Sequence, residues 1–447
     1  MDYYYPGHDP TVARELGAVS QTAKFEGPTS VERLVIFEIP SPMFGLVIVW
    51  NVVAMFMFGS HEGGGDRGNH KHDGPNYVNQ PWPSAPHSDA PTEAPITTVP
   101  TTNSTNDTVP VIDKVRFPKF VGQPAKVPIP TAPTCGISRK AKSSKETVYM
   151  TVDDGPSPGS RLNLLNAMDQ LNNRPNKVAP AYVTFLESGY NFCGQETDAI
   201  INLQCNAAAY DTALQLLVWT IKAGHMIAAH SDSHFYDAKA GFCNYRTMNA
   251  ATKIEDKFAK CGKDPWSDIV RGALRIDMAL SNETLWENDA EVAAYKRAVS
   301  TLWSYARLPC TNVWRLPDVT SVTGLRKEDL GPERDIRMMT AEKLFGGKLE
   351  CRADTKPWFV MGWDAEWRMD AKATYDAQRE KCRVVQDVVN QFDSKWKVGP
   401  RGDHVVLLTH DYFFADVAKA SMFRDVIAEL QFLGYTIGTL DQYPVKL

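Results

Sequence analysis

Short runs rich in β-branched and aromatic residues alternate with segments of helical periodicity from about residue 145 to the end of the chain. The runs lie at 147–152, 181–186, 225–230, 304–309, 358–363, 404–410 and 435–440. Helix-like stretches lie at 161–172, 210–224 and 421–434, and Gly224 and Gly434 stand where the last two should end. Because strands separated by helices pair in parallel, the pattern predicts an α/β fold, either a βα barrel or a doubly wound sheet.

Polar residues lie in or directly after several of these runs. They are Asp153, Asp154, His230, Arg307, Asp364 and His410. In parallel α/β folds the chemistry gathers at the carboxyl ends of the strands. The sequence therefore predicts a functional site at that edge of the sheet.

Two histidines in "HSDSH", His230 and His234, are four residues apart. In a helical turn this spacing places both imidazoles on one face, where they can bind one metal ion together. The pair alone is a weak signal, but an aspartate completes a set that suits Zn²⁺ with an open position, and another divalent transition metal is possible. We expect Asp154 to be the third ligand and Asp153 to act as general base towards metal-bound water. Taken alone, the two acids would favour a turn and helix N-cap, since "DDGPSPGS" is rich in turn formers.

The N-terminal third of the chain has a different composition. Residues 42–59 are apolar except for Asn51, and extension back to residue 35 makes the segment long enough to cross a bilayer. A buried core helix and a cleaved signal peptide are the alternatives, but the run is apolar all round and begins far from the N-terminus. We expect an N-terminal tail at 1–34, one transmembrane anchor at 35–59, a disordered Pro/Ser/Thr/Gly-rich stalk at 60–130, and a folded domain at 131–447.

A stalk followed by a large C-terminal domain fits a type II membrane protein, with that domain luminal or extracellular. Three N-glycosylation patterns follow the anchor, at Asn103, Asn106 and Asn282. All eight cysteines also lie after it, which favours disulfides over buried free thiols. Cys193–Cys205 and Cys243–Cys261 are the pairs nearest in sequence, although sequence does not fix the connectivity. A formal net charge of −5 provides no basic field for nucleic acid.

The segments "TVDDGP", "HSDSH", "ARLP", "GWDAEW" and "LLTHD", in this order, resemble the five motifs of the polysaccharide deacetylase family, the carbohydrate esterases with NodB homology. The resemblance covers about residues 145–445. It implies a distorted (β/α) barrel and metal-dependent removal of acetyl groups from a glycan. Carried over by position, it makes Asp153 the base and Asp154, His230 and His234 the metal ligands.

The same resemblance assigns the remaining motif residues. His410 becomes the general acid that protonates the leaving amine, Arg307 orients Asp153, and Asp364 holds the His410 ring, with Glu366 as an alternative for that support. The tetrahedral oxyanion would be stabilised by the metal and by a backbone N–H near Cys310. Cys310 stands where the family commonly has an aromatic residue. Asp411, directly after His410, is interpreted as a turn residue, with support of a site residue as the alternative.

The function expected from these residues is hydrolysis of N-acetyl groups on a glycan that contains N-acetylglucosamine, such as chitin or peptidoglycan. An O-acetyl esterase would use the same groups on a different leaving group. A carbohydrate-binding protein that has lost catalysis is the third interpretation, and the sequence argues against it because the ligands, the base and the acid are all present. The expected partners are the glycan and, through one helix, a membrane. The sequence does not indicate an oligomeric state.

Overall fold

The computed structural model describes residues 128–175, 178–192, 210–236, 243–246, 254–323, 332–352, 355–370 and 373–446. Each run expected to be a strand contains one. Three further strands, β5, β6 and β8, were not predicted. The strands are β1 (Thr147–Gly155), β2 (Thr184–Ser188), β3 (Met226–Ser231), β4 (Tyr305–Ala306), β5 (Asn312–Leu316), β6 (Val319–Thr323), β7 (Phe359–Val360), β8 (Ala365–Glu366), β9 (His404–His410) and β10 (Thr436–Gly438).

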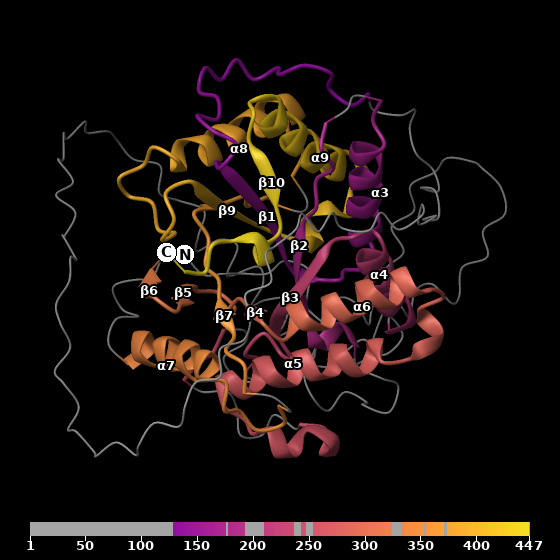
Figure 1. The fold of residues 1–447 in the computed structure, drawn as a ribbon, viewed down its shortest axis with the longest axis vertical. Coiled ribbons are helices and arrows are strands. Elements are labelled where there is room, and N and C mark those ends of the chain that lie inside the picture. The colour runs from indigo at the N-terminus through magenta and orange to yellow at the C-terminus, as the bar shows by residue number, and fades with distance from the viewer. Residues whose placement is uncertain are drawn as a thin grey trace, which may run out of the picture. The chain divides into compact units, whose positions relative to one another are not determined.

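These strands form one ten-stranded sheet in the order β6-β5-β7-β4-β3-β2-β1-β9-β8, with β10 paired to β1 off this path. Strand β1 runs parallel to β2, β9 and β10, and its register places Asp153 opposite His410. The dark β1 and the yellow β10 lie side by side in Figure 1 although they come from opposite ends of the folded region. The predicted parallel α/β arrangement is therefore confirmed, but β5 is antiparallel to both β6 and β7. Within the described residues the strand path is open.

The helices are α3 (Arg161–Asn172), α4 (Tyr210–Lys222), α5 (Pro265–Leu280), α6 (Asp289–Leu302), α7 (Pro332–Gly346), α8 (Ala377–Gln391) and α9 (Val417–Phe432). Gly224 and Gly434 follow α4 and α9 with φ of 83° and 89°. A left-handed residue after the last turn lets the next N–H groups bond back to the helix carbonyls, and glycine adopts it without steric cost. The predicted ends of both helices are thus confirmed to within a few residues.

Side-chain alternation along the strands produces two buried faces. On β1, Val148, Met150 and Val152 pack with α3, α8 and α9, while Tyr149 points to the other face. On β3, Ile227 faces a second helix-lined cluster and Met226 joins Tyr149. Because inner residues from strands across the sheet meet in one cluster, the sheet curls around it, as expected for a distorted barrel.

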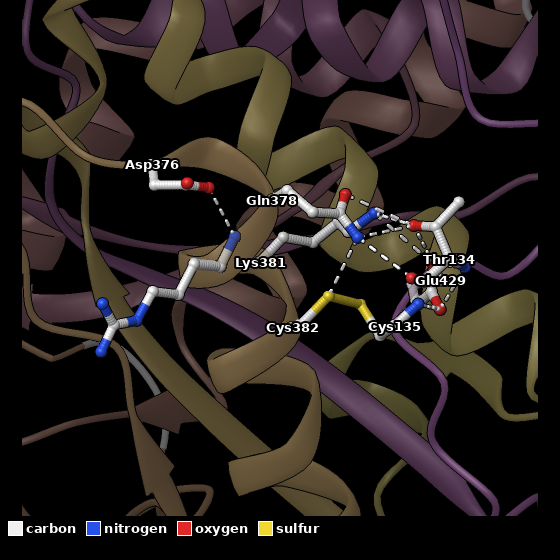
Figure 2. The surroundings of a disulfide bond; sticks show 8 residues. Thr134, Cys135, Asp376, Gln378, Lys381, Cys382 and Glu429 are labelled. Carbon is white, nitrogen blue, oxygen red and sulfur yellow. Dashed lines mark hydrogen bonds and ion pairs between the residues drawn. A yellow bond between two sulfur atoms is a disulfide. The ribbon is translucent and has the colours of Figure 1, made fainter.

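Three disulfides link the described residues: Cys135–Cys382, Cys243–Cys310 and Cys261–Cys351. The near-sequence pair Cys243–Cys261 is therefore wrong, and Cys193–Cys205 lies outside the described residues. Cys135 ties the entry segment of the domain to α8, and the backbone N–H groups of Thr134 and Cys135 donate to Glu429 on α9 at 2.9 Å each (Figure 2). The start of the domain is thus held by covalent and polar contacts together.

The N-terminal tail, the expected anchor at 35–59 and the stalk up to residue 127 lie outside the described residues. Among the residues that are described, we find no helix with the length and hydropathy that a membrane span requires. Asn282, one of the glycosylation patterns, is exposed between α5 and α6, where its side chain accepts from Thr284. Asn103 and Asn106 fall in the part of the chain that is not described.

Candidate metal centre and active site

The carboxyl ends of neighbouring strands bring the predicted site residues together. Asp153 and Asp154 lie near the end of β1, His230 near the end of β3, and His410 at the end of β9, while Arg307 directly follows β4. These strands run in the same direction, so their carboxyl ends share one edge of the sheet. The expectation that the strand ends would converge is confirmed.

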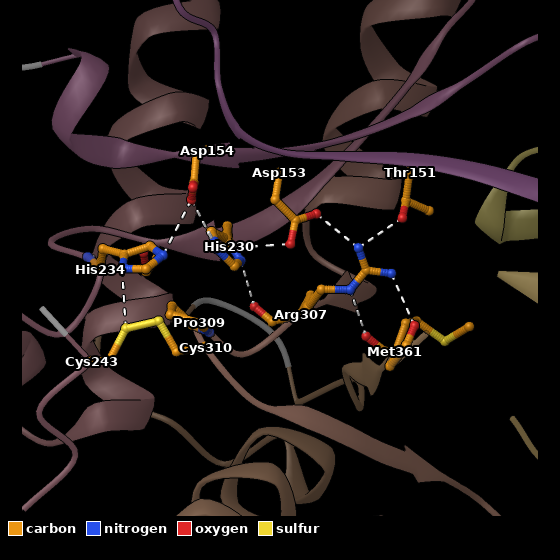
Figure 3. A network of polar contacts seen from close by, with 12 residues as sticks. Thr151, Asp153, Asp154, His230, His234, Cys243, Arg307, Pro309, Cys310 and Met361 are labelled. Atoms are coloured by element: carbon orange, nitrogen blue, oxygen red, sulfur yellow. Dashed lines mark hydrogen bonds and ion pairs between the residues drawn. A yellow bond between two sulfur atoms is a disulfide. The ribbon is translucent and has the colours of Figure 1, made fainter. Parts of the chain in front are cut away.

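Asp154, His230 and His234 form a buried cluster whose candidate ligand atoms all lie within 4.8 Å of one another. Asp154 Oδ1 is 3.2 Å from His230 Nε2 and 3.3 Å from His234 Nε2 (Figure 3). The histidines do not share a helical turn, as the spacing suggested. His230 lies in β3, and the chain turns after it with positive φ at His234 and Phe235, so that the ring centroids are 5.2 Å apart.

The chemistry of this donor set fits a divalent transition metal. His230 Nδ1 donates to the backbone carbonyl of Arg307 at 2.9 Å, which leaves Nε2 as the lone-pair nitrogen of the neutral ring, facing Asp154. Burial would raise the pKa of Asp154, but His234 and His230 outweigh it and hold that pKa well below its usual range. Burial would lower the pKa of His230, but Asp153 and Asp154 outweigh it and raise that pKa. Two imidazoles and one ionised carboxylate are a ligand set typical of catalytic zinc.

Asp153 is held by a buried arginine. Arg307 Nη1 donates to Asp153 Oδ1 and to Thr151 Oγ1, both at 2.8 Å, and its other N–H groups donate to the carbonyls of Met361 and Gly362. Asp153 Oδ2 lies 4.0 Å from His230 Nε2, next to the candidate metal ligands. The arrangement fixes one carboxylate oxygen on Arg307 and leaves the other towards the cluster (Figure 3). Thr151, which the sequence reading missed, could have been found from the period of two that places it on the same face of β1 as Asp153.

His410 lies beside Asp153 in the β1–β9 register and packs against Tyr412 and Phe413, with centroid distances of 5.5 Å. Burial lowers its pKa, although Asp154 and Asp153 oppose this. Its Nδ1 has no hydrogen-bond partner among the described residues.

The contact expected between Asp364 and the His410 ring does not occur. Asp364 instead accepts from the backbone N–H groups of Gly399 and Val406, at 2.6 and 2.8 Å. Val406 lies near the beginning of β9, whereas His410 is its last residue, so the two side chains sit at different levels of the strand. Glu366, the alternative support, pairs with Arg368 and is not hydrogen-bonded to His410 among the described residues.

A disulfide and a polar loop surround His234. Cys243 Sγ lies 3.6 Å from His234 Nδ1, and its disulfide partner is Cys310 of the third motif. The backbone N–H of His234 donates to Ser231 Oγ at 3.0 Å. The two sulfurs and a ring nitrogen of His234 lie within 4.8 Å of one another, a spacing that would suit a metal site. Because Cys243 and Cys310 form a disulfide, however, they are not available as thiolate ligands.

No protein-family model matches this chain. Among curated proteins it is similar to a chitin disaccharide deacetylase from Vibrio alginolyticus, with 24% identity over 359 residues, which are 71% of this chain and 77% of that protein. This similarity confirms the resemblance to polysaccharide deacetylases that the motifs predicted.

Solved structures are also similar to this chain. A CE4 esterase from Streptococcus mutans matches with a TM-score of 0.35 and 15% identity, covering 67% of this chain and 92% of that one. A polysaccharide deacetylase from Bacillus cereus matches with a TM-score of 0.31 and 17% identity, covering 66% of this chain and 91% of that one.

Proposed function

We propose that this chain, which resembles the polysaccharide deacetylases, is a metal-dependent hydrolase that removes N-acetyl groups from a glycan containing N-acetylglucosamine. The observation that carries the proposal is the joint placement of Asp154, His230 and His234 within 4.8 Å, with Asp153 directly beside them. A structural ion pair would need only one of these contacts. Three metal-type ligands beside a separately held carboxylate favour hydrolytic chemistry.

Asp154, His230 and His234 would hold the ion, with Zn²⁺ as the proposed metal. A bound divalent cation supplies Lewis acidity, which polarises the acetyl carbonyl and lowers the pKa of water. Asp153, oriented by Arg307, would accept the proton of the attacking water at Oδ2. An amine leaves poorly unless it is protonated, so the imidazolium form of His410, near Asp153 in the register, would donate its proton to the leaving nitrogen, and its lowered pKa makes that form a stronger acid.

Acetate release tests the substrate class. The purified chain with Zn²⁺ is expected to release acetate from chitin oligomers or from peptidoglycan fragments, and to act more slowly on acetylated xylan. Faster release from acetylated xylan would favour the O-acetyl esterase instead. Binding of the same oligomers without any acetate release would support the carbohydrate-binding protein and contradict the proposal.

We further propose a type II membrane topology, with the anchor at 35–59 and the proposed active site on the luminal or extracellular side. The apolar sequence of 42–59 and the disulfides after it support this arrangement. Protease added outside intact cells is expected to remove the C-terminal domain. Complete protection of that domain in intact cells, with digestion only after lysis, would contradict an extracellular placement. Digestion of the domain in sealed vesicles without detergent would then contradict the luminal placement as well.

A further inference from the structure

The loop that carries His234 is attached to helix α5. We call residues 231–236 the histidine loop. It begins at Ser231, the last residue of β3, and α5 packs on that strand. All six residues of the loop are buried. None of its contacts with α5 was predicted from the sequence, because α5 lies in the long connection between the second and third motifs.

Asp268 on α5 is the hub of these contacts. Its Oδ2 accepts from the backbone N–H groups of Asp232 and Ser233 at 3.2 and 3.1 Å, and its Oδ1 accepts from Ser233 Oγ at 2.8 Å. Its own backbone carbonyl accepts from Asp232 N–H at 3.0 Å. Asp268 has no exposed surface, so these bonds form away from water, where each lost partner is costly. A single side chain thus fixes the two residues directly before His234.

Two arginines of the same helix pair with the acid inside the loop. Asp232 lies between the two histidines in sequence and is itself a possible metal ligand. Its carboxylate is instead 2.8 Å from Arg275 Nε and 3.5 Å from Arg271 Nε, while Arg271 Nη2 bonds Asp268 at 2.8 Å. The two acids and two arginines compensate one another in a buried place. The carboxylate of Asp232 is thereby paired with the arginines of α5 and does not join the metal-ligand set.

A glycine allows the helix to approach the loop this closely. A Cβ added at Gly272 would lie 2.4 Å from the carbonyl carbon and oxygen of Ser231 and 2.7 Å from the nitrogen of Asp232. The helix backbone therefore packs directly on the loop backbone. Ser231 Oγ in turn accepts a hydrogen bond from the backbone N–H of His234. One hydrogen bond therefore connects the residue that Gly272 contacts with the proposed metal ligand His234.

We propose that Asp268 is a positioning residue for the metal centre: from α5 it fixes the histidine loop so that His234 faces Asp154 and His230. This inference rests on the proposed function, because it concerns the same ligand set. Partners outside the ligand set fix ligand orientation, and their replacement commonly lowers metal affinity by about 10–100-fold. A residue that serves only the fold would change the stability of the metal-free protein without changing that affinity.

The test measures the Zn²⁺ dissociation constant by chelator competition and the thermal midpoint of the metal-free chain by calorimetry. Asp268→Asn is expected to weaken Zn²⁺ binding by about 10–100-fold. Asp277→Asn is the matched control: Asp277 is on the same helix and accepts from Trp303 Nε1 at 2.8 Å, away from the loop. It is expected to lower the thermal midpoint but to keep wild-type Zn²⁺ affinity.

Ser233→Ala keeps the test decisive if Asp268→Asn does not fold. It removes the hydroxyl that donates to Asp268 and that also accepts from the backbone N–H of Tyr236 at 3.3 Å, both contacts of the histidine loop, and it should weaken Zn²⁺ binding in the same direction but less. Wild-type affinity in every folded variant of this contact would overturn the inference. Absence of Zn²⁺ binding by the wild-type chain would instead defeat the proposed function itself, so the two failures are distinguishable.

Discussion

Replacement of Asp153 by Asn is expected to lower kcat/KM for acetate release by about 10²–10⁴-fold, the usual contribution of a general base. Asn has nearly the same size, and its amide oxygen can still accept the N–H of Arg307 that Asp153 Oδ1 now accepts at 2.8 Å. What it lacks is a second basic oxygen towards the cluster. Turnover should therefore be lost without loss of the fold.

Zinc binding and a control variant separate this result from general damage. Asp153→Asn should retain wild-type Zn²⁺ stoichiometry, because Asp153 is not in the ligand set. Asp364→Asn replaces another buried acid of the same sheet, whose carboxylate lies on the N–H groups of Gly399 and Val406. It should lower stability and leave kcat/KM close to wild type. Wild-type kcat/KM in Asp153→Asn would contradict the assignment of Asp153 as the general base.

The part of the site that the sequence predicted is the part set by strand ends. In a parallel sheet, polar residues at the carboxyl ends of neighbouring strands lie close together, whatever the conformation of the connecting loops. Asp153, His230 and His410 follow this rule. Asp364 does not, because the strand that follows it, β8, is only Ala365–Glu366 and pairs with Leu407 and Leu408 of β9. The sequence predicted that Asp364 lies at the end of a strand-like run, but not which residues of β9 lie beside it.

Contacts between distant segments were the main failures. Asp411, interpreted as a turn residue, has no exposed surface and forms an ion pair of 2.6 Å with Arg161, which also binds Glu187 at 2.7 Å. Burial raises the pKa of Asp411 to about 6, although Arg161 opposes this. Arg161 is 250 residues away in sequence, and no local pattern links the two. The disulfide Cys243–Cys310, 67 residues apart, was missed for the same reason.

The second failure was local geometry at the ligands. Spacing of four residues suggested a helical turn, yet the structure places His230 in β3 and Asp154 and His234 in left-handed conformations, with φ of 68° and 55°. Such conformations are uncommon for residues with a side chain and persist only where the surroundings impose them. For His234 those surroundings include α5, which sequence analysis left undescribed. The sequence predicted which residues are the candidate ligands, but it did not predict the backbone conformations that orient their side chains.

Zinc affinity is expected to fall as the pH falls below the raised pKa of His230, by about tenfold for each pH unit while one proton competes with the ion. The sign follows from the site: Asp153 and Asp154 raise this pKa, so the ring binds a proton at a higher pH than a free imidazole, and only the neutral ring binds a metal. Asp154 adds nothing to this dependence, because its pKa lies well below the usual range.

His230→Ala tests the same residue directly and should lower Zn²⁺ affinity by more than about 100-fold, beyond the cost of changes outside a ligand set. It should abolish acetate release as well, in contrast to Asp153→Asn, which should lose turnover alone. The control is His225→Ala, on the residue directly before β3 at its other end, where the buried ring accepts from the N–H of Val183. That variant should keep Zn²⁺ affinity and its pH dependence. Equal affinities in His230→Ala and wild type would place the ion elsewhere and contradict the proposed ligand set of Asp154, His230 and His234.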